Sequence, residues 1–168
     1  VLHRWDQLRS TVGLSLEEQR LVAAVAARLA DDVAPVQGSI VHGDFAPWNI
    51  GLGADGSELS LFDWEYGDEC GLPMLDVIHF VLRTGILVEG LHGEALLDSV
   101  DEAMGRPAAA DYQCRAGVRA SDLGAYVIQY LLLQLVKEGE QHQQAKSKEL
   151  RDLLHLLALA WRRWGGGR

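Results

Sequence analysis

Apolar residues recur every three or four positions over most of the chain, and this spacing predicts five helices. The five stripes are Val22, Val25, Leu29 and Val33; Leu75, Ile78 and Leu82; Leu96, Val100 and Met104; Leu123, Val127, Leu131 and Leu135; and Leu150, Leu154, Leu157, Trp161 and Trp164. Each stripe gives its helix one face to bury. The pattern therefore predicts a mostly helical protein.

Capping and breaking residues set the expected ends of these helices. Ser15 and Glu18 form a capping box at the start of the first helix, because each side chain can bond the other's backbone amide. Pro35 is expected to end that helix, Gly85 the second and Gly105 the third.

A short segment between the first two helices has a different pattern. Residues 49–52 and 59–62 read as two strands, and the turn residues 53–56 between them predict a β-hairpin. Residues 39–41 form a short apolar run that predicts a strand leading into His42. The expected fold class is α+β, mostly α, with a small β element.

Composition and charge limit the classes of partner that we expect for this protein. The 168 residues are 48% hydrophobic and carry a net charge of -9, as in a folded acidic protein. A surface this negative argues against nucleic acid or an anionic membrane as a partner. Two distant cysteines, and no apolar run long enough to span a membrane, lead us to expect a cytoplasmic protein.

Three oxygen-bearing side chains carry the candidate chemistry. Asp44 is followed five residues later by Asn49, and Asp63 lies at the far end of the predicted hairpin. Phosphoryl transfer needs a carboxylate that orients and deprotonates the attacking hydroxyl, and oxygen ligands for Mg²⁺. Each residue alone has a simpler interpretation as a turn or strand-end residue. Their joint spacing favours Asp44 as catalytic base, with Asn49 and Asp63 as ligands of Mg²⁺ bound to ATP.

These motifs resemble those of a known family. The segment from His42 to Asn49, His-Gly-Asp-Phe-Ala-Pro-Trp-Asn, resembles the catalytic loop of the aminoglycoside phosphotransferase and choline kinase-like superfamily. Residues 63–65, Asp-Trp-Glu, resemble its magnesium-binding segment, and residues 71–76 resemble the element that follows. The resemblance implies ATP-dependent phosphorylation of a hydroxyl on a small molecule. It also implies a protein-kinase-like fold.

Three further residues receive supporting roles. The resemblance implies that His42 braces the catalytic loop, and a histidine beside a loop commonly satisfies backbone carbonyls. We expect Asp76 to be the N-cap of its helix and to hydrogen-bond the loop. Glu65 is interpreted either as a metal or acceptor contact or as an exposed glutamate. The remaining histidines, His79 among them, show no metal-ligand spacing with one another.

The expected domain is the C-terminal lobe only, over residues 1–168. Residues 41–76 would form the catalytic loop, hairpin and metal segment, and residues from about 90 to 164 a helical acceptor-binding part. The family's N-terminal nucleotide lobe supplies a lysine that contacts phosphates, but all three lysines here follow the catalytic loop. We therefore expect that lobe to lie in a longer chain and this piece alone to be inactive.

Two other functions stay open at this point. One is a non-catalytic kinase-like binding module, and the other is a metal-dependent phosphohydrolase that uses the same acidic groups. The acceptor also stays open among aminoglycosides, choline-like amines, amino-alcohols and sugars.

Overall fold

The computed structural model describes residues 13–31, 38–141 and 147–165, and these are mostly helical with two small antiparallel sheets. The chain divides into two compact units. One unit comprises Val1–Ala34 with Leu123–Arg168, and the other comprises Pro35–Asp122. The expected α+β class, mostly α, is confirmed.

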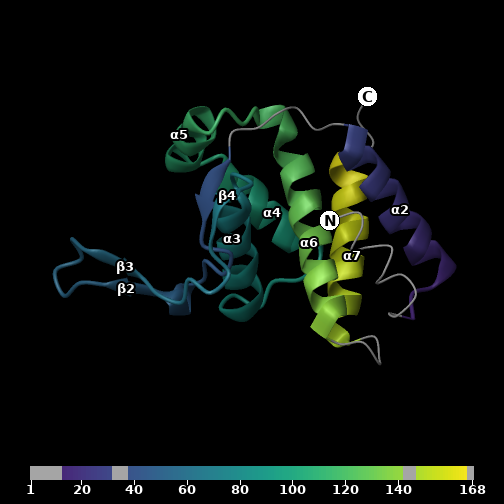
Figure 1. Cartoon of the computed structure of the whole chain (residues 1–168), viewed down its shortest axis with the longest axis horizontal. Helices are drawn as coiled ribbons and strands as arrows, with labels where there is room; N and C mark the ends of the chain where they lie inside the picture. The colour runs from purple at the N-terminus through teal and green to yellow at the C-terminus, as the bar shows by residue number, and fades with distance from the viewer. Residues whose placement is uncertain (1–12, 32–37, 142–146, 166–168) are drawn as a thin grey trace. The chain divides into compact units, whose positions relative to one another are not determined.

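The first unit contains three described helices: α2 (Leu16–Asp31), α6 (Leu123–Gln141) and α7 (Lys148–Trp164). Figure 1 shows α6 and α7 side by side. The predicted apolar stripes form their buried faces, with Val22 and Val25 on α2, Leu131 on α6 and Leu157 on α7 fully enclosed. Burial of these side chains is the main force that holds such a helical unit together.

The capping box at the start of α2 is confirmed. The Ser15 amide donates to Glu18 Oε2 at 2.8 Å, and the Glu18 amide donates to Ser15 Oγ at 3.3 Å. The predicted end of this helix at Pro35 lies outside the described residues.

The second unit contains the remaining elements. They are β1 (Ser39–Val41), η1 (Pro47–Asn49), β2 (Ile50–Leu52), β3 (Leu59–Leu61), β4 (Asp68–Gly71), α3 (Leu75–Leu87), α4 (Glu94–Met104), α5 (Pro107–Arg115) and η2 (Ala120–Asp122). Strand β1 pairs with β4, and β2 pairs with β3. The predicted hairpin and the predicted strand at residues 39–41 are thus confirmed, and Figure 1 shows the hairpin extending away from α3.

Helix α3 runs past the glycine that was expected to end it. Gly85 is buried inside the helix, which continues to Leu87, so that prediction is wrong. A Cβ at position 85 would lie 2.8 Å from a methyl carbon of Leu96 on α4. The glycine here lets two helices approach closely, which is a packing role rather than a stop signal. The helix predicted to end at Gly105 is confirmed as α4.

No helix within the described parts of the chain combines the length and apolar character needed to cross a membrane.

Candidate active site

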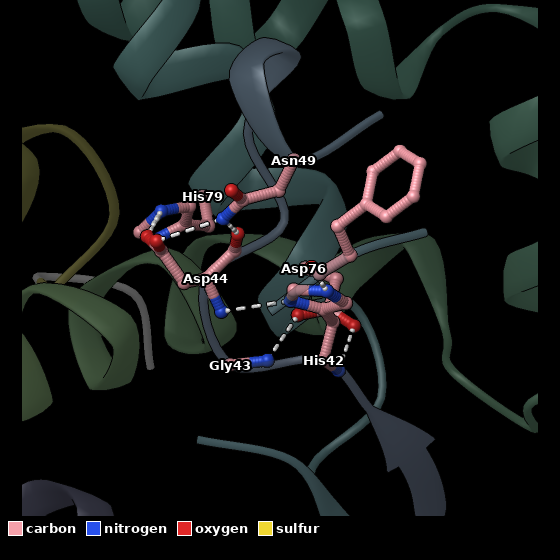
Figure 2. Close-up of polar contacts among 7 residues, drawn as sticks. His42, Gly43, Asp44, Asn49, Asp76 and His79 are labelled. Carbon is pink, nitrogen blue, oxygen red and sulfur yellow. Dashed lines mark hydrogen bonds and ion pairs between the residues drawn. The ribbon is translucent and has the colours of Figure 1, made fainter. Parts of the chain in front are cut away.

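The carboxylate of Asp76 holds the loop that follows β1. Asp76, in the first turn of α3, accepts hydrogen bonds from the His42 amide to Oδ2 at 2.6 Å and from the Gly43 amide to Oδ1 at 3.0 Å. Figure 2 shows both contacts. Bonds from backbone amides to an ionised carboxylate are among the stronger hydrogen bonds in proteins. These two hydrogen bonds fix the backbone that leads into Asp44.

Asp76 makes these contacts without being the N-cap. The N-cap of α3 is Met74, which has a left-handed backbone with φ of 70° and no side-chain capping bond. The predicted N-cap role of Asp76 is therefore wrong. Its carboxylate points to the loop rather than to the free amides of its own helix.

Asn49 holds the candidate base. Its side-chain amide nitrogen donates to the backbone carbonyl of Asp44 at 2.9 Å and to Asp44 Oδ2 at 3.0 Å. Asn49 itself is buried, at the end of the short η1 turn that begins at Pro47. The turn thus brings the two residues, five apart in sequence, into direct contact (Figure 2).

Asp63 follows Phe62, whose backbone amide and carbonyl both have polar partners. The Phe62 amide donates to the Asn49 carbonyl at 2.9 Å, and the Phe62 carbonyl lies 2.7 Å from His42 Nε2. Asp63 has a φ of 63°, so the backbone turns sharply directly after the hairpin, and its side chain is exposed. These contacts tie the position of Asp63, through its neighbour Phe62, to the loop that carries Asp44.

Acidic residues raise the pKa of the Tyr66 hydroxyl. A hydrogen bond and then the charge of Glu65 raise the pKa of the Tyr66 hydroxyl, and the charges of Asp44 and Asp63 raise it further. The backbone of Tyr66 also packs on Gly43, whose φ of 79° suits glycine.

Sequence reasoning missed His79. Its Nε2 lies 3.0 Å from Asp44 Oδ1, and the residue is 4% exposed (Figure 2). Burial, and then the charge of Arg83, lower the pKa of His79, while the charges of Asp44 and Asp76 act in the opposite sense. A signal was present, because His79 lies three residues after Asp76 and so shares its helix face.

The donor set fits a site for Mg²⁺ with few protein ligands. The side-chain nitrogen of Asn49 donates to Asp44, so Asn49 Oδ1 can still bind another partner. Asp63 has an exposed carboxylate. Mg²⁺ usually takes one or two protein oxygens, with phosphates and waters completing the shell. No cluster of three or more His, Cys, Asp or Glu suited to a metal occurs among the described residues.

In protein kinases an aspartate and, five residues later, an asparagine take part in phosphoryl transfer, and Asp44 and Asn49 have this spacing. Residues 2–117 match the model of the phosphotransferase enzyme family (APH), and the chain belongs to this family. The match extends well beyond residues 41–76, on which the resemblance to aminoglycoside phosphotransferases and choline kinases was based. No curated protein and no solved structure matches the chain significantly.

Proposed function

We propose that the chain carries the chemical centre of an ATP-dependent enzyme that phosphorylates a hydroxyl of a small molecule. Within a protein-kinase-like fold it would supply the C-terminal lobe. The observation that carries this proposal is the Asp44 carboxylate, held at 3.0 Å by Asn49 and followed across the hairpin by Asp63. Family membership supports phosphotransferase activity in general. The donor, the acceptor and the residue roles are part of the proposal.

Asp44 would act on the acceptor hydroxyl. Its side chain is 22% exposed, so it can reach a bound molecule while its orientation is fixed from the protein side. In this role it would accept the hydroxyl proton as the oxygen attacks the terminal phosphate of ATP and the bond to the bridging oxygen breaks, so that ADP leaves. Asn49 keeps the carboxylate in place through its amide nitrogen.

Asn49 and Asp63 would hold Mg²⁺. When bound, the metal supplies positive charge against the phosphate oxygens. Glu65 is a further candidate for contact with metal or acceptor, but its contact with Tyr66 offers a structural explanation as well.

His42 and Asp76 would support the reacting groups without touching them. Asp76 fixes the start of the loop, and the ring of His42 fixes the carbonyl that precedes Asp63. Positioning of this kind matters because phosphoryl transfer depends mainly on geometry and charge.

The proposal is tested by transfer of labelled γ-phosphate in the full-length protein. ATP and Mg²⁺ are supplied with a panel of aminoglycosides, choline-like amines, amino-alcohols and sugars. We expect one class to become labelled, and Asp44→Ala to abolish labelling while Mg²⁺-dependent ATP binding survives. Glu17→Gln is the control, because Glu17 is an exposed carboxylate on α2, outside the segments proposed to hold the reacting groups or the acceptor.

The same assay separates the other functions. A phosphohydrolase would release the label to water with no acceptor labelled. A binding module would retain nucleotide without turnover. An Asp44→Ala enzyme with normal transfer would contradict the role of Asp44 directly.

A further inference from the structure

A buried histidine contacts the candidate base. His79 comes from the middle of α3, whereas Asp44 lies in the loop after β1, and their contact joins residues 35 apart in sequence. The distance from His79 Nε2 to Asp44 Oδ1 is 3.0 Å, which is a normal hydrogen bond.

The two oxygens of Asp44 are held by different partners. His79 bonds Oδ1, and the Asn49 side chain donates to Oδ2 at 3.0 Å. Rotation of the carboxylate about its last torsion would break both bonds together. Each carboxylate oxygen can accept two hydrogen bonds, so a direction remains for an acceptor hydroxyl.

The protonation state of His79 suits this task. Burial and the charge of Arg83 lower its pKa, so the ring is neutral near pH 7. Asp44 as a carboxylate can only accept, so the neutral ring must carry its proton on Nε2. A neutral donor orients the carboxylate and leaves more of its basicity than a cation would.

We propose that His79 is a positioning residue for phosphoryl transfer, which fixes the Asp44 carboxylate through an Nε2–H···Oδ1 hydrogen bond. This inference rests on the proposed function, in which Asp44 is the base. It assigns to α3 a direct influence on the reacting group, in addition to the grip of Asp76 on the loop backbone.

The test compares two substitutions in the full-length protein. His79→Leu keeps an apolar side chain in the buried site but removes the donor. His79→Gln restores an N–H at similar reach. We expect His79→Leu to lower kcat on the order of 10- to 100-fold, with KM for ATP and acceptor changed less than about twofold. His79→Gln should recover most of the lost kcat, and Arg20→Gln, at an exposed site on α2, should have no effect.

Two kinetic results would overturn the inference: full kcat in His79→Leu, or no recovery in His79→Gln. Asp44→Asn is measured in parallel. If it is inactive while His79→Leu is fully active, the proposed function stands and the positioning role alone fails. If Asp44→Asn is fully active, the proposed function fails and the inference falls with it.

A second measurement uses the wild-type protein, so it does not depend on whether a variant folds. The ¹⁵N chemical shifts of the His79 ring, measured by NMR at pH 7, distinguish the two neutral forms and the cation. We expect the form with the proton on Nε2 only. A ring protonated on Nδ1 alone, or on both nitrogens, would overturn the proposed hydrogen bond.

Discussion

The ring nitrogen Nε2 of His42 lies 2.7 Å from the carbonyl oxygen of Phe62, twenty residues further along the chain. This contact joins the loop that carries Asp44 to the residue that precedes Asp63. The His42 ring is buried and also packs against the Trp64 ring, with centroids 4.6 Å apart. One side chain thus fixes the loop that carries Asp44 and the end of the hairpin relative to each other.

Replacement of His42 by leucine should weaken both stability and transfer. The change keeps an apolar body of similar size but leaves the Phe62 carbonyl without this partner. Loss of one hydrogen bond of this kind costs about 0.5–1.5 kcal/mol. Urea denaturation should show this loss, and the transfer rate should fall further because Asp63 is no longer anchored. Unchanged stability with full transfer would contradict the bracing role.

Asp76→Asn should destabilise the loop although it changes only one atom of the side chain. The carboxylate accepts from two backbone amides, and an asparagine can offer one oxygen while its amide group faces the second donor. Hydrogen bonds to a charged group contribute about 1.5–3 kcal/mol. The denaturation midpoint should fall accordingly. Asp111→Asn, which removes an exposed ion pair, should leave the midpoint close to wild type.

Gly124→Ala should destabilise the first unit. A Cβ at position 124 of α6 would lie 2.5 Å from Cβ and Cγ of Trp164, atoms too close to the α7 backbone to swing aside. Overpacking costs about 1–3 kcal/mol, which exceeds the gain of about 1 kcal/mol in helix propensity. We expect a Tm lowered by about 2–4 °C for each kcal/mol of net loss.

The control for this glycine is Gly105→Ala. A Cβ there would lie 3.5 Å from its nearest neighbours, an ordinary contact, and the backbone φ of −76° is accessible to alanine. Its Tm should stay near that of the wild type. A larger fall for Gly105→Ala than for Gly124→Ala would refute the packing argument.

His79 should make stability depend on pH. Its pKa is lower in the folded state, so the unfolded chain binds a proton more readily and folding loses free energy as the medium becomes acidic. The contribution is fully present above about pH 6.5, the unfolded value, and is lost as pH falls through the lowered folded value. Arg83 strengthens this effect, while Asp44 and Asp76 weaken it.

Urea denaturation between pH 5 and 8 measures this contribution. The difference in free energy of unfolding between wild type and His79→Gln should change with pH in this range, with wild type losing more toward acid. Arg20→Gln, which removes no group that titrates in this range, should run parallel to wild type. A pH-independent difference for His79→Gln would show that the ring does not titrate as described.

The elements that local pattern determines were predictable from the sequence. The capping box at Ser15 and the hairpin with its short connection depend on neighbours within a few positions. The spacing of Asp44 and Asn49 belongs to the same class, because one short turn creates their contact.

Elements set by distant partners were not predictable in this way. Strand β4, with the sequence Asp-Glu-Cys-Gly, lacks strand-forming residues and exists because it pairs with β1. Gly85 has the local character of a helix end, but contact with Leu96 of α4 explains its place inside the helix. His79 escaped notice because the residue that it contacts lies 35 positions away and no metal spacing marks it.

The left-handed backbone at Asp63 restricts which residues evolution can place there. A φ of 63° is favourable for glycine and tolerable for aspartate and asparagine, whereas a β-branched or bulky residue would be strained. If all twenty residues were tried at this position, we expect Gly, Asn and Asp to give well-folded protein and Asp alone to support rapid transfer. Backbone geometry would then exclude most residue types at position 63, and metal binding would exclude all of the remaining ones except aspartate.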